Sequence, residues 1–388
     1  MKFALYFIFP TSPYTYMKGL YIHVPFCRSR CIYCDFFSTT QGEEAKGRYV
    51  QSLCQELYSR RCYAGSPILS SIYMGGGTPS ILSPQQLHTI FSTIKENYEI
   101  EDGAEITIEA NPDDINPEFI STLKQLGINR ISLGIQTFKD SILKVLNRRH
   151  NGLQAIEAVH LLHENGIENI SIDLIYGLPQ QTLSDWDFDL QTMLQLPITH
   201  LSAYALIYEE GTPIERMRKE GQVKEANEEL SLAMYELLIQ KSAEQGLLQY
   251  EISNFAKPGM QAKHNSSYWA NKPYLGCGPG AHSYDGRKRR FNLPNLQKYC
   301  NGEHLYSEEL LSQEERFNER IMTALRTRKG LSLNELGNEF GLPFQKVLLK
   351  NAQDYLSKGQ LVIENDYLRL SQQGIFISDL IISELMIV

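Results

Sequence analysis

The fold is decided by residues 19–34, in which the apolar run GLYIHVPF (19–26) leads directly into Cys27-Arg-Ser-Arg-Cys31-Ile-Tyr-Cys34. A short apolar run of this kind is typical of a buried strand. Three cysteines fall within this stretch, whereas the others are scattered, at Cys54, Cys62, Cys277 and Cys300. Clustered thiols in a cysteine-poor chain indicate a metal site in a reducing compartment rather than a disulfide framework.

The number of thiols in this cluster favours iron and sulfur over zinc. A structural zinc site takes four ligands, usually as two separated pairs, and the stretch contains no fourth cysteine. A cubane iron–sulfur cluster on three thiolates keeps one iron open for another ligand. Arg28 and Arg30 add positive charge, which favours the thiolate form. The spacing therefore predicts an iron–sulfur cluster held by Cys27, Cys31 and Cys34.

Short apolar runs alternate with amphipathic stretches from residue 19 to about residue 245. We expect strands at residues 19–26, 70–75, 105–110, 130–136, 169–177 and 200–207. We expect helices at residues 44–62, 84–98, 117–125, 139–163 and 184–195, with N-caps at Ser83 and Asn116. Such alternation predicts an α/β fold with a parallel sheet, here an incomplete (β/α)6 barrel over residues 17–210.

The alternation stops after residue 225. A long amphipathic helix is expected at residues 225–246, and the Tyr-, Asn-, Gly- and Pro-rich residues 247–300 are expected to be mostly irregular, within a helical and irregular region over 211–310. Residues 311–388 carry a winged-helix pattern, with helices at 313–328, 332–340 and 343–358, strands at 360–364 and 367–370, and a last helix after Ser371. The third of these helices is only weakly basic, so we expect a structural or protein-binding domain rather than a DNA reader.

Composition narrows the function classes. The chain has 388 residues, 42% hydrophobic and 21% charged, with a net charge of −8, which disfavours a dedicated binder of nucleic acid or anionic membranes. No apolar run reaches the ~18 residues of a membrane span, so stable membrane insertion is not expected. Residues 1–16 are expected to be a disordered extension or to precede the true start at Met17, and a weak signal-peptide reading lacks a small-residue cleavage site. We expect a cytoplasmic protein.

Polar residues recur where the predicted strands end, at Gly76, Glu109, Gln136 and Asp173. In barrel enzymes this end of the strands builds the active site. Each of these residues interrupts an apolar run, which costs free energy unless a ligand or partner satisfies it. The stretch 73–79, YMGGGTP, adds glycines that let backbone amides approach a ligand. The strand ends therefore predict a ligand site beside the cysteines.

The cysteine triplet after YIHVPF, followed by the glycine-rich stretch 73–79, resembles the radical S-adenosylmethionine (radical SAM) superfamily. The resemblance implies a [4Fe–4S] cluster on Cys27, Cys31 and Cys34. It also implies that the amine and carboxylate of S-adenosylmethionine chelate the fourth iron. Gly76, Gly77 and Thr78 would then lie at the methionine end of this cofactor.

A closer resemblance, to the coproporphyrinogen-dehydrogenase branch, assigns further cofactor-binding residues. The matching positions are Glu109 in IEANP, Gln136 in GIQTF, Arg148 in LNRRH, Asp173 in IDLIYGLP, Tyr21 and Ile207. The resemblance implies that Glu109 and Asp173 bind ribose hydroxyls or the ammonium, and that Arg148 faces a carboxylate. Tyr33 would lie beside the cluster and the adenine. A solvated cation at a helix end is the alternative reading of Arg148.

Two subfamilies of this branch compete. The oxygen-independent coproporphyrinogen III dehydrogenases continue the cysteine motif to a further cysteine, whereas this chain has Phe36 there. The C-x-F ending and the stretch 264–269, HNSSYW, resemble the haem chaperone HemW subfamily and its H-N-x-x-Y-W motif. Neutral imidazole is a standard haem ligand, so His264 is a candidate for haem b, with Cys277 and His282 as weaker alternatives. A His-Asn pair that only hydrogen-bonds the backbone is the competing reading.

The resemblance leads to one leading function and two alternatives. The leading hypothesis is a haem chaperone that binds haem, a [4Fe–4S] cluster and S-adenosylmethionine, and passes haem to clients such as respiratory-chain cytochromes. The first alternative is a coproporphyrinogen III dehydrogenase that makes vinyl groups by oxidative decarboxylation. The second, a redox-sensing DNA regulator, is opposed by the thin basic patch. A homodimer is compatible with the sequence.

Overall fold

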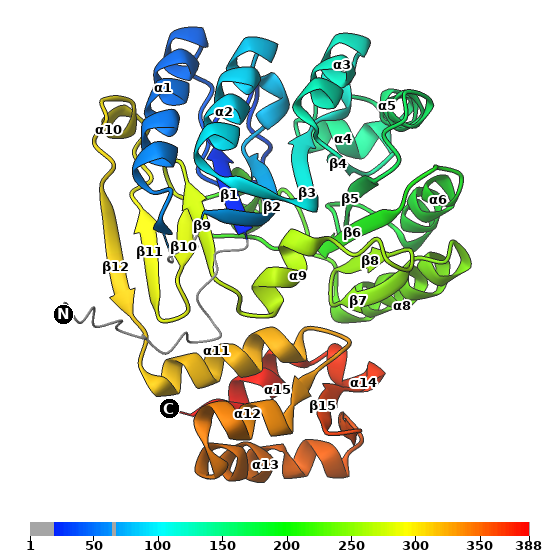
Figure 1. The fold of residues 1–388 in the computed structure, drawn as a ribbon. Helices are drawn as coiled ribbons and strands as arrows, with labels where there is room; N and C mark the ends of the chain where they lie inside the picture. Colours follow the sequence, from blue (N-terminus) through cyan, green and yellow to red (C-terminus); the bar gives the residue numbers. More distant parts are fainter. Residues whose placement is uncertain (1–18, 64–66, 388) are drawn as a thin grey trace, which may run out of the picture.

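The computed structural model describes residues 19–63 and 67–387. The expectations for residues 1–16 lie outside these ranges. Within them, no helix combines the length and the apolar composition that crossing a membrane requires. The described chain forms a curved sheet wrapped by helices, with a smaller domain packed below it (Figure 1).

Six parallel strands make the centre of the sheet, and they lie side by side in chain order. They are β1 (Gly19–Val24), β2 (Ile68–Gly76), β3 (Glu99–Ala110), β4 (Arg130–Gln136), β5 (Ile170–Tyr176) and β6 (His200–Ala205). The helices between them cover the outer face: α1 (Glu43–Ser59), α2 (Pro84–Asn97), α3 (Pro117–Leu126), α4 (Asp140–Val145), α5 (Gly152–Glu164) and α6 (Leu183–Leu194). The predicted incomplete (β/α)6 barrel is confirmed.

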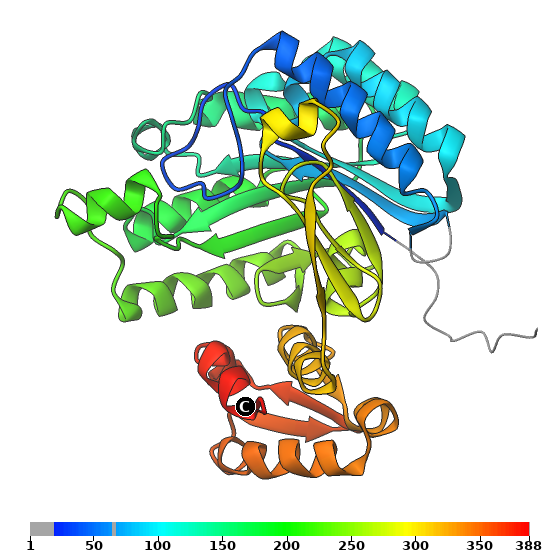
Figure 2. The ribbon, with the colours of Figure 1, turned by 90° about the vertical axis from the view of Figure 1, so that its left-hand side faces the viewer.

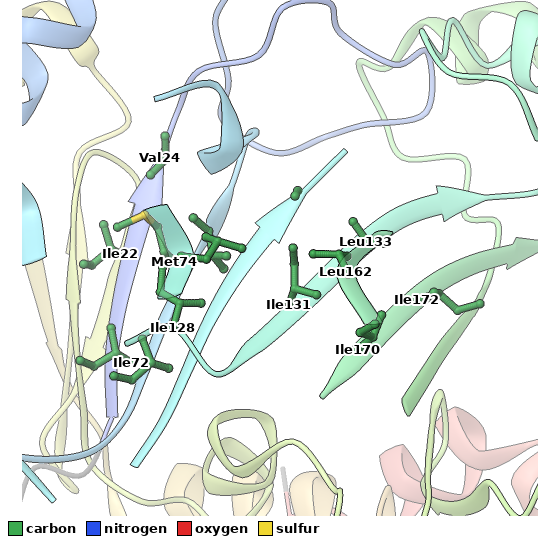
Figure 3. Close-up of a cluster of buried hydrophobic side chains, with 14 of the residues drawn as sticks. Ile22, Val24, Ile72, Met74, Ile128, Ile131, Leu133, Leu162, Ile170 and Ile172 are labelled. Carbon is green, nitrogen blue, oxygen red and sulfur yellow. The ribbon is translucent and has the colours of Figure 1, made fainter. Parts of the chain in front are cut away.

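The side chains of each central strand point alternately into the hydrophobic core and into the interior of the barrel. Ile131 and Leu133 of β4 are fully buried and point to the helical layer, together with Ile170 and Ile172 of β5 (Figure 3). Because successive side chains of a strand point to opposite faces, the residues between them point into the barrel. The interior therefore receives polar side chains from strands whose outer face forms a continuous apolar core.

The single helix expected at residues 139–163 is wrong, because the chain breaks there into α4 and α5. Asn147 adopts a left-handed conformation with φ 60°, which ends the first helix. Asn151 then starts α5 with a capping box to Gln154. The break places Arg148 on the loop between the helices. The predicted N-caps at Ser83 and Asn116 are confirmed, each accepting a backbone N–H of its helix.

The expectation of mostly irregular structure at residues 247–300 is also wrong. This region contains β7 (Leu248–Glu251), β8 (Asn254–Ala256), α9 (Lys263–Trp269), β9 (Tyr274–Cys277), β10 (His282–Tyr284), β11 (Lys288–Asn292) and α10 (Leu296–Cys300). β9 pairs in parallel with β1, and β10, β11 and β12 (Tyr306–Leu310) continue from it, while β8 and β7 extend the other edge beyond β6. Strands this short, separated by Gly and Pro, leave little period-2 signal. The preceding helices are α7 (Pro213–Lys219) and α8 (Glu228–Glu244).

Helix α9 lies across the amino-terminal ends of the barrel strands (Figure 1). The buried carboxylate of Glu105, on β3, accepts hydrogen bonds from the backbone N–H groups of Lys263 (2.8 Å) and His264 (3.0 Å). A carboxylate at a helix N-terminus satisfies otherwise unpaired donors and complements the helix dipole. α9 is thereby fixed as the floor of the barrel.

The C-terminal domain has the predicted helices and wing. Its elements are α11 (Gln313–Leu325), β13 (Leu331–Ser332), α12 (Leu333–Phe340), α13 (Leu342–Ser357), β14 (Leu361–Glu364), β15 (Tyr367–Leu370), α14 (Gln372–Ile375) and α15 (Ser378–Leu385). Asn365 and Asp366 both have positive φ, as a tight hairpin turn requires. The domain lies below the barrel (Figure 2). Its contacts with the barrel include the Arg289–Glu319 ion pair (2.9 Å) and the packing of Phe376 on Tyr235.

Candidate functional site

A cavity of about 560 Å³ occupies the barrel interior, bounded by the cysteine loop at one end and by residues of α9 at the other. Apart from the alternative haem ligands Cys277 and His282, every residue that the sequence singled out for a cofactor or metal borders it. They are Tyr21, Cys27, Cys31, Tyr33, Cys34, Gly76, Gly77, Thr78, Glu109, Gln136, Arg148, Asp173, Ile207 and His264. The structure thus brings these side chains to one place, while their roles toward a ligand stay predictions.

The three cysteines lie part-buried on the loop after β1. Arg148 Nη1 donates to Cys31 Sγ (3.3 Å), and the Thr78 hydroxyl donates to Cys27 Sγ (3.5 Å). Burial raises the pKa of the Cys34 thiol to about 11, so a cluster must displace thiol protons when it binds. No three Cys, His, Asp or Glu residues of the described chain surround a single metal ion. A cubane needs no such arrangement, since each thiolate binds a different iron.

Backbone hydrogen bonds hold the glycine-rich stretch against the residues that lead into the cysteine loop. Gly77 N–H donates to Val24 O (2.7 Å), Thr78 N–H to Phe26 O (2.7 Å) and Gly76 N–H to Glu109 Oε2 (3.1 Å). A Cβ on Gly77 would lie 2.7 Å from Phe26 O, so only glycine allows this approach. The amides of this stretch are therefore paired within the protein, and the glycines position the loop rather than free its N–H groups.

Two buried carboxylates face the cavity from β3 and β5. Glu109 accepts a hydrogen bond from the Tyr73 hydroxyl (2.6 Å) as well as from Gly76, and burial raises its pKa to about 7. Asp173 accepts from the Ser132 hydroxyl (3.1 Å), and burial raises its pKa too. Burial disfavours the charged form of each carboxyl group, and a cation bound between the two would favour the charged form again. The pair suits a cationic ligand.

Arg148 is not a solvated cation at a helix end. Its Nη2 donates to Asn111 Oδ1 (2.6 Å) and to the backbone carbonyl of Gly134, and its Nη1 reaches Cys31. Its Nε is buried and has no hydrogen-bond partner in the described chain. The guanidinium is fixed beside the cysteine loop with its Nε donor unused, which fits a ligand carboxylate.

The mouth of the cavity is partly apolar. Phe36 and Ile207 border it with 58% and 65% of their surfaces exposed. Gly280, in the stretch before β10, packs against Phe37, which brings the segment of His282 next to the loop that carries Phe36. Exposed apolar side chains beside an enclosed polar cavity are suited to cover a ligand with a flat apolar face.

His264 lies at the opposite end, on α9, with 2% of its surface exposed. Its Nδ1 pairs with the Ser71 hydroxyl (2.8 Å) and its Nε2 with the Tyr268 hydroxyl (2.8 Å). Burial lowers its pKa to about 3, so the ring is neutral. A metal can bind this histidine only if one hydroxyl gives way. Of the two weaker alternatives, Cys277 is fully buried in the core, whereas His282 is exposed and its ring makes no hydrogen bond in the described chain.

Comparison with known proteins assigns the family. The sequence matches the radical SAM superfamily over residues 21–192 and the HemN C-terminal domain over residues 311–377. It is 35% identical to the heme chaperone HemW of Lactococcus lactis, over 92% of this chain and 94% of that protein. Identity to the heme chaperones HemW of Bacillus subtilis (35%; 92% and 96% covered) and Escherichia coli (32%; 94% and 97% covered) is similar. The chain belongs to the HemW family.

A comparison of structures shows which solved fold this chain shares. The structure of coproporphyrinogen III oxidase (HemN) from Escherichia coli superimposes with a TM-score of 0.83, over 96% of this chain and 91% of that one. Its sequence identity is 22%, so this likeness shows the fold. The barrel and the C-terminal domain are therefore those of a radical SAM protein with a HemN-type tail.

The site of this HemW-family chain also contains residues that the sequence analysis missed. Those with polar side chains bordering the cavity include Tyr73, Asn111, Arg130, Ser132, His200, Ser202 and Asn254. Strand alternation could have found several of them, since Arg130 and Ser132 precede Gly134 at every second position of β4. Asn111 lies on a turn, where no such period points inward.

Proposed function

We propose that this protein is a haem chaperone of the HemW type, which binds haem and passes it to client proteins. The observation that carries the proposal is its 31–35% identity, over more than nine-tenths of the chain, to proteins named heme chaperone HemW. Phe36, in place of a further cysteine, supports it from the site. We expect the clients to include respiratory-chain cytochromes and the protein to act in the reducing cytoplasm.

The cavity fits the two cofactors that the family implies. Cys27, Cys31 and Cys34 would hold a [4Fe–4S] cluster, with Arg148 and Thr78 donating to two of the sulfurs. Glu109 and Asp173 would bind cationic or hydroxyl groups of S-adenosylmethionine, and Arg148 Nε would meet its carboxylate. Cluster and S-adenosylmethionine together supply one-electron chemistry when bound. The residues present match both donor sets.

For haem we propose the apolar mouth of the cavity, where Phe36 and Ile207 would cover part of the macrocycle. In this proposal a histidine would bind the haem iron. His264, the first candidate from sequence, has both ring nitrogens hydrogen-bonded. His282 is exposed and lies edge-on to Phe291 (4.7 Å between ring centroids). Partial desolvation of its ring, together with the positive charge of Arg289, lowers its pKa and favours the neutral form. His282 therefore meets the requirement for iron more readily.

Anaerobic titration with haem tests this proposal. The reconstituted protein should bind haem with a Soret band at one equivalent, and should leave coproporphyrinogen III unchanged when S-adenosylmethionine and a reductant are present. Formation of protoporphyrinogen would contradict a chaperone assignment. His282→Ala and His264→Ala, compared side by side, identify the ligand by which one changes the Soret band.

The apolar mouth is tested separately by Phe36→Ala. We expect weaker haem binding, by roughly tenfold, because an exposed aromatic that covers a ligand contributes on the order of 1–2 kcal/mol. Leu153→Ala is the matched control, since this side chain of α5 is 63% exposed and borders no part of the cavity. Equal affinities in both variants would exclude the mouth as the haem site.

The comparisons do not favour a coproporphyrinogen III dehydrogenase. The curated relatives reported above carry the chaperone name, and the likeness to HemN rests on fold at 22% identity. The assay with coproporphyrinogen III covers this alternative directly.

A further inference from the structure

The closed end of the cavity holds a positive charge without a partner. Arg130 begins β4 and is only 2% exposed, yet it borders the cavity. Its Nε has no hydrogen-bond partner, and its guanidinium forms no hydrogen bond or ion pair within the described chain. A buried guanidinium is strongly disfavoured unless an anion pairs with it.

The groups around Arg130 do not supply that anion. Glu109 and Asp173 are close enough to feel its charge, but their carboxylates are bonded to Tyr73, Gly76 and Ser132 instead. The two histidines nearby, His200 and His264, have pKa values lowered by burial and by the Arg130 charge, so both are neutral. Their nitrogens already pair with hydroxyl groups.

The surroundings restrict what can reach this arginine. α9 closes the floor below it through the Glu105 bonds, so a ligand does not enter from that side. A small barrel holds its own side chains or at most one small ligand, so the space beside Arg130 suits a small ligand or the end of a short chain. A carboxylate on such a chain matches the planar fork of a guanidinium in two hydrogen bonds.

We propose that Arg130 anchors an anion site at the closed end of the cavity, which takes a carboxylate carried on a short chain. The carboxylate comes either from a free small acid or from a propionate of a tetrapyrrole. Only the second source rests on the proposed haem function. The site is distinct from the Arg148 position beside the cysteines, which lies at the opposite ends of the strands.

The first arm of the test uses sodium propionate and the protein without cluster. Propionate, at constant ionic strength with chloride as the reference anion, should raise the Tm of the wild type and not that of Arg130→Met. Arg30→Met is the matched control, because Arg30 borders the cavity from an exposed position, and it should keep the shift. Arg130→Lys, which retains charge without the fork, replaces the Met variant if that one does not fold.

The second arm compares haem with haem dimethyl ester. If a tetrapyrrole supplies the carboxylate, the ester should bind wild type about tenfold more weakly than haem, and Arg130→Met should weaken haem but not the ester. Equal binding of haem and ester, together with a propionate shift that depends on Arg130, supports a free acid as the source. No propionate shift and no difference between haem and ester would overturn the site. Absence of all haem binding, with the propionate shift intact, would reject the proposed function and leave the site standing.

Discussion

Glu109 shows, at the scale of one residue, how a buried carboxyl group makes the stability of the protein depend on pH. Its pKa rises from 4.5 to about 7 because the carboxyl is buried. The folded state therefore holds a proton that the unfolded state releases between these values, so stability falls as pH rises from about 4.5 to 7. The shift corresponds to about 3 kcal/mol lost across this window.

Urea unfolding of the protein without cluster, from pH 5 to pH 8, measures this loss. Glu109→Gln should flatten the decline, because the amide carries no titrating proton. Glu157→Gln, at an exposed position of α5, controls for the loss of a carboxylate and should keep the wild-type decline. Identical slopes for Glu109→Gln and wild type would show that this carboxyl does not titrate in the window.

Residue identities at the site were largely predictable, and their partners were not. Gly76, Glu109, Gln136 and Asp173 stand out because polar residues at strand ends violate an apolar pattern. The hydrogen bond from Tyr73 to Glu109 joins residues 36 positions apart, and no local pattern encodes that distance. Arg130 was missed because an arginine before an apolar run reads as a solvated strand start.

At the scale of one element, helix α9 depends on a carboxylate from another part of the chain. It has seven residues, and Ala262 at its N-cap provides no side-chain bond. Glu105 accepts two of its N–H groups instead. Glu105→Gln should lower the unfolding free energy by about 1–3 kcal/mol, because an amide can accept only one of these bonds and opposes the other.

Hydrogen exchange separates a local effect from a global one. If the Glu105 carboxylate holds α9, the amide hydrogens of residues 263–269 should exchange faster in Glu105→Gln than in the wild type. Exchange in β4 and β5 should change little. Glu101→Gln, an exposed position of the same strand, should leave α9 protected. Uniformly faster exchange would mean that Glu105 supports the whole barrel rather than this helix.

The elements were predictable in proportion to their length and periodicity. Strands β1–β6 and the long helices gave clear signals, and the strands expected at 360–364 and 367–370 are joined by a turn in which Asn365 and Asp366 have positive φ. The strands of residues 247–300 were missed because they have three to five residues each. These strands pair with the edges of a sheet whose other strands lie far away in the sequence. The β-propensity of a short segment does not predict such pairing.

At the scale of the whole molecule, the buried carboxylate of Glu56 connects the strands at one edge of the barrel to helix α1. Glu56 of α1 is fully buried and pairs with Arg60 (3.0 Å), while also accepting bonds from Gly278 N–H, Asn292 and Tyr299. These bonds attach the strands β9–β11 and helix α10 to the first helix of the barrel. The sequence offered no sign of this, because the partners lie more than 200 positions away.

The placement of the C-terminal domain makes a last prediction. Arg289 of β11 and Glu319 of α11 form an ion pair of 2.9 Å across the boundary, with both side chains less than one-third exposed. A double-mutant cycle with Arg289→Ala and Glu319→Ala should give a coupling of about 0.5–1 kcal/mol, larger at low salt than at high salt. If the pair orients the domain, each single variant should also accelerate hydrogen exchange in α11 and α9, which are in contact.

The ion pair Arg369–Glu364, within the wing, is the control. Its removal should leave hydrogen exchange in α9 unchanged. A cycle that couples without affecting α9 would mean that the pair stabilises the boundary but does not transmit the position of the domain to the floor of the cavity.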